Sequence, residues 1–281
     1  MAKSKFGKLV YISRPRFYPY LLGTYLVGFT SVANKADFLS LTFLLTFIFF
    51  TLPANLFLYG INDLYDSDTD KYSVKKKGKE FVASQKDKLL SRATLYCFLI
   101  GIVTLIIQTS FLSMMSLSLF LALSYLYSAS PFRLKARPFL DFGANFLYIT
   151  PGLVGYFQNT NTYPPLLIIL AASFWAFAMH IFSAIPDIKA DKNAQLKTTA
   201  VFLGRKNAII LCVLFWSLTS FILFYINMPV TLSLVSLTYP SIAFLAFKIS
   251  EKDYIKLYWY FPAINLIVGF LLFSVSALHL L

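Results

Sequence analysis

The chain has few charged residues for its length, and acidic residues are the scarcest of them. Only 13% of its 281 residues are charged and only 12 are Asp or Glu, whereas about a quarter of a typical soluble domain is charged. Hydrophobic residues make up 58% of the chain, and its mean hydropathy is +0.68. A composition this apolar cannot cover a water-facing surface, so it excludes a soluble globular protein and predicts an integral membrane protein.

Cysteine is also scarce, which argues against a disulfide-linked protein and against a cysteine metal site. The two cysteines, Cys97 and Cys212, both lie inside long apolar runs. Two residues without a spacing pattern indicate neither a disulfide framework nor a cysteine metal site.

Long apolar runs contain most of the hydrophobic residues. Each run is close to the ~20 residues that a helix needs to cross a bilayer, and the stretch 92–128 is long enough for two crossings joined by a tight turn. The pattern predicts an all-α integral membrane protein of about nine transmembrane helices, forming a single domain over 1–281. The predicted spans are 18–34, 38–60, 92–112, 113–128, 139–158, 164–184, 208–226, 229–247 and 257–280.

Basic residues outnumber acidic ones, 25 against 12, and their positions indicate the topology. With a cytoplasmic N-terminus, every Lys and Arg except Lys35 falls within or at the edge of a cytoplasmic segment, as the positive-inside rule requires. The excess positive charge is then explained by topology and by contacts with anionic membrane lipids, and we expect no nucleic acid partner. The five cytoplasmic segments are 1–17, 61–91, 129–138, 185–207 and 248–256.

Three of these segments have further predicted roles. Residues 1–17 form an interfacial lead-in, because Arg14 and Arg16 stand where a signal peptide would have its apolar core. The two longest segments that follow a span, 61–91 and 185–207, are predicted to be the cytoplasmic active-site loops.

Half of the acidic residues fall in two short stretches, one in each of these loops. In the first, Asn62, Asp66 and Asp70 are spaced at i, i+4 and i+8, which places them on one face of a helix. Like charges on one face repel each other unless a cation lies among them. The acids of the two stretches are Asp63, Asp66, Asp68, Asp70, Asp187 and Asp191.

Oxygen ligands of this kind favour a hard cation, and Mg²⁺ takes few carboxylates because substrate phosphates complete its coordination. Two carboxylate clusters on one side of the membrane therefore predict Mg²⁺ ions that hold a diphosphate between them. Asp66, Asp70, Asp187 and Asp191 are the predicted catalytic acids, and together with Asn62 they are the predicted metal ligands.

Three other interpretations of the acids were considered. An EF-hand loop is rejected, because Lys71 and Lys77 occupy the positions that need Gly and Glu. A solvated acidic loop does not explain the helical spacing. A secondary transporter would have its ion site near the middle of the membrane, whereas these acids lie at helix ends; it remains the non-enzyme alternative.

Basic residues near the acids are candidates for holding the anion. Arg133 and Lys135 lie between the fourth and fifth predicted spans, and Lys197 follows the second acidic stretch. Each of them either contacts phosphate oxygens or anchors the chain at the cytoplasmic interface.

Two polar residues precede the acidic stretches by seven positions, Asn55 before Asn62 and His180 before Asp187. This spacing places each on the same helix face as the site, so both are predicted to support it or to line its pocket. For His180 we favour a hydrogen-bonded packing role over that of a base.

These residues resemble the motifs of the UbiA superfamily of intramembrane prenyltransferases, and the resemblance covers nearly the whole chain. It implies a bundle of nine helices around a central cavity, with the active site facing the cytoplasm. It also implies Mg²⁺-dependent transfer of a prenyl group from an allylic diphosphate to a lipophilic acceptor in the bilayer. The matching positions are Asn62, Asp63, Asp66 and Asp70; Tyr127, Ser128, Pro131, Arg133 and Lys135; Asp187 and Asp191; and the run 197–204. Asp63, Tyr127 and Ser128 are then support or pocket residues.

Within the superfamily, the stretches 12–17 and 53–60 resemble the lycopene elongase branch, so a carotenoid such as lycopene is the expected acceptor. Many quinone-type members have an Arg where this chain has Tyr11, and this difference argues against an aromatic carboxylic acid such as 4-hydroxybenzoate as the acceptor. The alternative acceptors are an aromatic quinone precursor and a glycerol-phosphate ether lipid.

Overall fold

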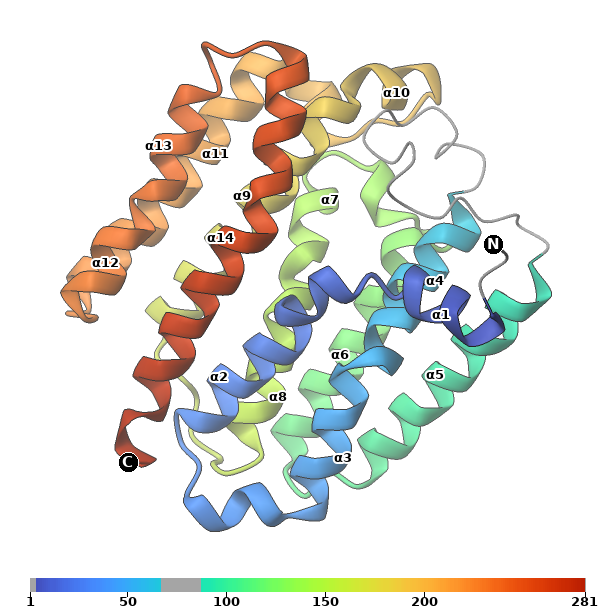
Figure 1. The fold of residues 1–281 in the computed structure, drawn as a ribbon, viewed down its shortest axis with the longest axis vertical. Helices are drawn as coiled ribbons and strands as arrows, with labels where there is room; N and C mark the ends of the chain where they lie inside the picture. Colours follow the sequence, from blue (N-terminus) through green and yellow to red (C-terminus); the bar gives the residue numbers. More distant parts are fainter. Residues whose placement is uncertain (1–3, 67–86, 281) are drawn as a thin grey trace.

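The structure is a computed structural model that describes residues 4–66 and 87–280. Within these ranges every regular element is helical (Figure 1). The helices are α1 (Lys5–Ile12), α2 (Thr24–Thr30), α3 (Leu41–Phe50), α4 (Leu52–Tyr65), α5 (Lys88–Ile106), α6 (Phe111–Ser128), α7 (Leu140–Gly143), α8 (Thr150–Phe157), α9 (Leu166–Ala184), α10 (Ile188–Asn193), α11 (Thr199–Tyr225), α12 (Val230–Ser236), α13 (Thr238–Leu245) and α14 (Glu251–Ala277).

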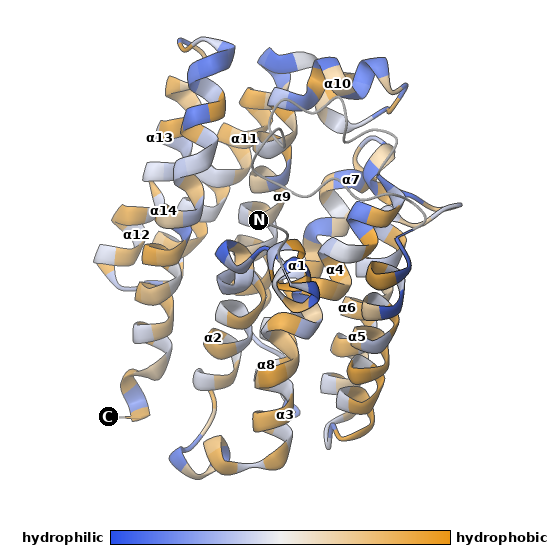
Figure 2. Ribbon diagram, turned by 45° about the vertical axis from the view of Figure 1, so that its right-hand side comes forward, coloured by the Kyte–Doolittle hydropathy of each residue, from blue (hydrophilic) through white to orange (hydrophobic). Residues whose placement is uncertain are grey.

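Six segments of the described chain are long and apolar enough to cross a membrane. Their hydrophobic residues run along the bundle, while hydrophilic residues gather around α10 and the adjacent end of α14 (Figure 2). The all-helical, membrane-spanning prediction is therefore confirmed. The six segments are Leu41–Tyr65, Lys88–Ile106, Phe111–Ser128, Leu166–Asn193, Thr199–Tyr225 and Glu251–Leu280.

The remaining predicted spans are built from shorter helices, so the count of nine stays a prediction. The run 18–34 contains a π-helix (Pro19–Gly23) followed by α2, and the run 229–247 contains α12 and α13. The run 139–158 contains α7, a 3-10 helix (Ala144–Tyr148) and α8. Proline begins two of these short pieces, at Pro19 and within the first turn of α8, because it lacks the N–H that would continue the preceding turn.

Helix α11 begins well before the predicted start of its span at 208. Thr198 caps it, its side chain accepting a hydrogen bond from the Val201 amide at 3.3 Å. The helix is interrupted at Gly204, whose φ of 72° is a left-handed conformation that glycine adopts without strain. The residues before Gly204 thus form a separate helical turn at the membrane edge.

The N-terminal lead-in is tied to the bundle by charge. The Lys8 ammonium lies 2.6 Å from the carboxylate of Asp87, which also caps α5 by accepting from the Leu90 amide at 3.1 Å. Partial burial is the largest single influence on Asp87 and opposes its ionisation, but the hydrogen bond and charge of Lys8 together with the backbone amides of Leu89 and Leu90 outweigh it and lower the pKa of that carboxyl.

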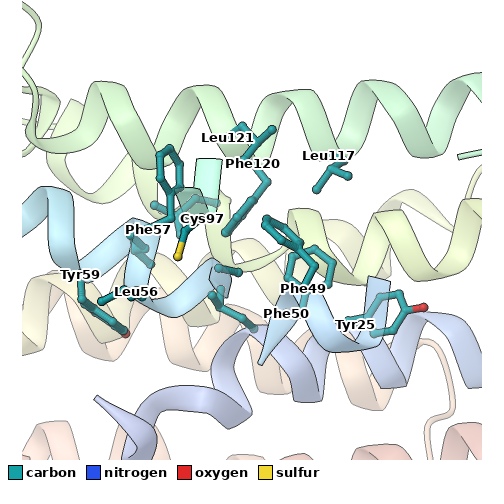
Figure 3. Close-up of a cluster of buried hydrophobic side chains, with 14 of the residues drawn as sticks. Tyr25, Phe49, Phe50, Leu56, Phe57, Tyr59, Cys97, Leu117, Phe120 and Leu121 are labelled. Atoms are coloured by element: carbon teal, nitrogen blue, oxygen red, sulfur yellow. The ribbon is translucent and has the colours of Figure 1, made fainter. Parts of the chain in front are cut away.

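Two clusters of buried side chains form the core, one in each half of the chain. The first is rich in aromatic rings from α2 to α6, with centroids 5.3 Å apart for Tyr25 and Phe50 and 5.5 Å apart for Phe50 and Phe120 (Figure 3). In the second, Trp216 of α11 stacks on Phe261 of α14 at 5.7 Å. Each half of the bundle therefore has its own packed interior.

The close crossing between α2 and α8 depends on glycine. A Cβ on Gly28 would overlap the backbone carbonyl of Gly152, and a Cβ on Gly155 would lie 2.8 Å from the amide nitrogen of Phe29. Small residues allow such close approach between membrane helices, where van der Waals packing drives association.

We expect Gly28→Ala to destabilise the protein by about 1–3 kcal/mol, because the added methyl forces two backbones apart. The measurement is thermal unfolding of the purified protein in detergent. The matched control is Gly269→Ala in α14, where a Cβ meets no atom within 4 Å. Equal melting temperatures for both variants would contradict the assigned crossing.

Candidate active site

A cavity of about 270 Å³ lies between the two halves of the bundle and collects most of the predicted site residues. Residues of both core clusters reach it, for example Leu58 and Phe261. Of the predicted residues, those that line it are Asn62, Asp66, Tyr127, Lys135, His180, Asp187 and Asp191.

The two acidic stretches meet at this cavity from opposite halves of the chain. Asn62 lies in the last turn of α4, and Asp66 ends that helix with its amide bonded to the Asn62 carbonyl at 3.0 Å. Asp187 lies in the 3-10 helix Ile185–Asp187 and Asp191 in α10. The predicted shared helix face is therefore observed for Asn62 and Asp66, whereas Asp70 lies outside the described residues.

Within the described ranges, no group of three His, Cys, Asp or Glu side chains is close enough to hold a metal ion by itself. The oxygen ligands that line the cavity, Asn62, Asp66, Asp187 and Asp191, still suit Mg²⁺, which binds through one or two carboxylates and takes its other ligands from water and phosphate.

Asp66 is buried and is held by two basic residues. Its carboxylate pairs with the Lys135 ammonium and, at 3.3 Å, with the Arg133 guanidinium. Burial lowers the pKa of Lys135 to about 7, and the negative charges of Asp63 and Asp191 oppose that effect. An anion placed in the cavity would therefore stabilise the charged form of Lys135.

Lys197 is placed differently from the other two predicted diphosphate residues. It is exposed and is not among the residues that line the cavity. Its neighbour Thr198 does line the cavity and donates a hydrogen bond to Asp191 at 3.3 Å. A role of Lys197 in diphosphate binding stays a prediction.

Arg14 is a cavity residue that the sequence analysis did not place in the site. Its guanidinium forms an ion pair of 2.6 Å with the fully buried Asp63 and lies 4.7 Å from the ring centre of Tyr59. Asp63 is not among the residues that line the cavity but pairs with one that is, and its supporting role stays a prediction. The only sequence signal for Arg14 was its place in the 12–17 stretch.

Aromatic rings from several helices form part of the cavity wall. Tyr20 lies at the centre of this group, with ring centroids 5.5 Å from Phe17, 6.1 Å from Tyr148 and 6.4 Å from Trp175. Periodicity could not single out these rings among the 30 Phe, 18 Tyr and 3 Trp of the chain. Tyr20 and Tyr148 lie in short helices that were predicted as parts of continuous spans.

Two predicted supporting residues, Ser128 and Asn55, are not among the residues that line the cavity. Ser128 accepts a hydrogen bond from the Asn62 amide group at 3.2 Å, which orients the Asn62 side chain. Asn55 is fully buried and donates to the carbonyls of Phe50 at 3.2 Å and Thr51 at 2.6 Å, so it bridges the break between α3 and α4.

Asp141 is a second residue that the sequence analysis missed. Its carboxylate is fully buried in α7 and accepts hydrogen bonds from the Thr199 amide at 2.7 Å, from the Thr199 hydroxyl, and from the Phe142 amide at 2.9 Å. It also lies 3.6 Å from Nε2 of His180. Asp141 therefore joins the start of α11 to the cavity wall.

Comparison with known proteins agrees with this arrangement. The model of the UbiA prenyltransferase family matches residues 21–259. The lycopene elongase/hydratase of Haloarcula japonica is 36% identical over 97% of this chain and 91% of its own, and that of Halobacterium salinarum is 35% identical over 94% of both chains. A UbiA homologue from Archaeoglobus fulgidus, bound to DMAPP and Mg²⁺, has the same fold, with a TM-score of 0.71 and 24% identity over 95% of this chain and 99% of that one.

The family match covers most of the chain, and both relatives exceed 30% identity over nearly their whole lengths. Together with the apolar helices, they make this protein a multi-pass membrane prenyltransferase that belongs to the UbiA prenyltransferase family.

Proposed function

We propose that the protein transfers a prenyl group from an allylic diphosphate to a lipophilic acceptor, and that the acceptor is a carotenoid such as lycopene. The observation that supports this most is the mixed lining of one cavity. Carboxylates and Lys135 line it together with aromatic rings such as Tyr20 and Trp175, and Trp175 precedes Asp187 by twelve residues, or about 18 Å of helix rise. An allylic diphosphate likewise combines a charged head with an apolar tail.

The charged side chains would bind the diphosphate together with Mg²⁺. We infer that Asn62, Asp66, Asp187 and Asp191 hold the metal, with Asp70 as a further predicted ligand outside the described residues. Bound Mg²⁺ would neutralise the diphosphate and stabilise it as a leaving group. The Archaeoglobus fulgidus homologue bound to DMAPP and Mg²⁺ supports this inference.

The basic residues have a separate role in the proposed reaction. Lys135 and Arg133, which pair with Asp66 in this structure, would turn to the phosphate oxygens and stabilise the charge that develops as the C–O bond breaks. Positive groups fixed in place before the reaction act best where charge develops in the transition state.

The aromatic rings would protect the allylic cation and bind the acceptor. Electron-rich ring faces stabilise a carbocation through cation–π attraction, and an apolar wall excludes the water that would quench it. Lipid contact at the bundle surface would let an apolar acceptor enter from the bilayer.

Several observations favour a carotenoid over an aromatic acid as the acceptor. The relatives named lycopene elongase/hydratase cover nearly the whole chain. Of the basic side chains that line the cavity, Arg14 is paired with the buried Asp63 and Lys135 is assigned above to the diphosphate, so neither is reserved for an acceptor carboxylate. An aromatic quinone precursor and a glycerol-phosphate ether lipid are the alternatives.

The proposed topology has nine spans in a single domain over 1–281, a cytoplasmic N-terminus and a cytoplasmic active site in the cell membrane. It is supported by the distribution of basic residues and by the hydrophilic end of the bundle around α10 (Figure 2). The 1–17 lead-in and the 61–91 and 185–207 loops would then lie on that side.

Asp187→Asn is expected to reduce prenyl transfer by about 100-fold or more, because an amide cannot replace a carboxylate as a Mg²⁺ ligand and charge partner. Transfer should also stop when EDTA removes the metal. The measurement is release of diphosphate and formation of prenylated product by the purified protein.

The matched control for this variant is Asp253→Asn, which changes a carboxylate paired only with exposed groups at the start of α14. Full activity of Asp187→Asn, or activity in EDTA, contradicts the metal–diphosphate assignment. A transporter would instead move its substrate across sealed vesicles without releasing diphosphate.

The acceptor is tested by supplying the protein with Mg²⁺, dimethylallyl diphosphate and one acceptor at a time. We expect lycopene to gain five-carbon units, detected by mass spectrometry, while 4-hydroxybenzoate and a glycerol-phosphate lipid remain unchanged. Prenylation of either of the latter in place of lycopene would exclude the carotenoid assignment.

The topology is tested with single introduced cysteines, since Cys97 and Cys212 are both buried. Thr162→Cys, in the exposed loop between α8 and α9, should react with a membrane-impermeant maleimide in intact cells. Lys192→Cys, exposed in α10, should react only after the cells are permeabilised. The reverse pattern would place the active site on the outer side.

A further inference from the structure

Three side chains from three different helices meet at the wall of the cavity, next to the aromatic rings. They are Tyr127 of α6, Asp141 of α7 and His180 of α9. The Tyr127 hydroxyl lies 3.4 Å from Nδ1 of His180, and Nε2 of the same ring lies 3.6 Å from the Asp141 carboxylate. Tyr127 and His180 line the cavity, whereas Asp141 is fully buried behind them.

The contacts of Asp141 favour its charged form. Three donors point at its oxygens, the Thr199 amide and hydroxyl and the Phe142 amide. Hydrogen bonds to a carboxylate stabilise its ionised form. An ionised Asp141 attracts the N–H of His180 Nε2, which leaves the lone pair of Nδ1 on the side of Tyr127 and the cavity.

A purely structural histidine would not need this arrangement. Asp141 already caps the start of α11 through Thr199, so it does not require His180 for its own hydrogen bonding. Nε2 of His180 is buried and has no hydrogen-bond partner in the part of the chain that the structure describes. Buried polar atoms usually have a hydrogen-bond partner, so an unsatisfied Nε2 needs an explanation. Hydrogen bonds between catalytic groups are often long before substrate binds, and the 3.6 Å distance from Nε2 to Asp141 fits that description.

Formation of an alkene product in the proposed prenyl transfer requires a base. The allylic cation takes the electron pair of an acceptor C=C bond, which forms a C–C bond and leaves a tertiary carbocation on the acceptor. The product alkene forms when a neighbouring C–H bond breaks and its electron pair becomes the new C=C bond. The proton must then pass to a group in the cavity.

We propose that His180, oriented by Asp141, is the base that accepts this proton. The inference rests on the proposed prenyl transfer. The proton reaches Nδ1 directly, or reaches the Tyr127 oxygen while the Tyr127 O–H proton moves to Nδ1. Either route leaves an imidazolium beside the Asp141 carboxylate, and the proton passes to water after the products leave.

The place of His180 along α9 fits this step. It precedes Asp187 by seven residues, or about 10 Å of helix rise, and follows Trp175 by five, so along the chain it lies between the acidic cluster and that ring. A five-carbon donor with its diphosphate at the acidic cluster would extend toward this level. The proposed base thus lies about two helical turns before Asp187, within reach of a five-carbon chain whose diphosphate is held at the acidic cluster.

The test compares two quantities in one assay, diphosphate released and prenylated product formed, in the full-length protein with Mg²⁺, dimethylallyl diphosphate and lycopene. His180→Gln should lower alkene product by about 100-fold, as for loss of a general base, while diphosphate release stays within about threefold. The carbocation would instead be captured by water, so allylic alcohol or hydrated carotenoid should accumulate.

The matched control is His279→Gln, which changes the other histidine of the chain. His279 contacts the Ala33 carbonyl near the C-terminus, at the opposite end of the bundle from α10 (Figure 1). This variant should keep the wild-type ratio of product to diphosphate.

A parallel fall of diphosphate release and product in His180→Gln would overturn the inference, because it would indicate lost binding or folding. An unchanged ratio would overturn it as well. In a second test, His180→Ala should regain alkene product when imidazole is added, without a change in diphosphate release; failure of this rescue counts against the base.

The proposed function has its own outcome in the same assay. If the wild-type protein prenylates 4-hydroxybenzoate in place of lycopene, only the carotenoid acceptor is contradicted. Formation of that product also requires loss of a ring proton, so wild type and His180→Gln can be compared with 4-hydroxybenzoate as the acceptor. A wild-type protein that prenylates no acceptor overturns the proposed function and the inference with it.

Discussion

A buried carboxylate in a lipid-facing bundle is stable only beside positive charge or hydrogen-bond donors, and this requirement organises the protein. Asp63 pairs with Arg14, Asp66 pairs with Lys135, and Asp141 accepts from Thr199. Each contact joins segments far apart in the sequence. Loss of one partner would leave a buried charge uncompensated, which costs about 3–5 kcal/mol. The charges that prepare the site for its substrate therefore also hold the fold around it.

The same pairing explains how an apolar bundle can hold several charged side chains around one cavity. Asp66 and Lys135 neutralise each other in the structure described here. In the proposed function, the diphosphate and its metal ions bring charges of both signs. Asp66 would then exchange Lys135 for a metal ion, and Lys135 would exchange Asp66 for a phosphate oxygen. Binding then needs rearrangement of side chains and little change in net charge, which keeps the cost of burying the substrate low.

Sequence analysis predicted the elements that depend on local periodicity and composition. Apolar runs identified the long helices, and i, i+4 spacing correctly placed Asn62 beside Asp66. It could not predict Arg14 or Asp141 as site residues, because their roles depend on partners 49 and 58 residues away. The short helices around α2 and α8 were also missed as separate elements, since hydropathy does not distinguish a straight span from a broken one.

His180 shows why a site needs three-dimensional neighbours for its interpretation. Its spacing to Asp187 indicated only a shared helix face, and a packing role was the simpler interpretation. With Asp141 on one ring nitrogen and Tyr127 on the other, a directed proton path becomes the better account. About two helical turns separate the proposed base from Asp187, a predicted metal ligand, and this separation would have a chemical benefit. A histidine beside the metal ions would be drawn into their coordination, whereas one two turns away would keep its lone pair for the carbocation.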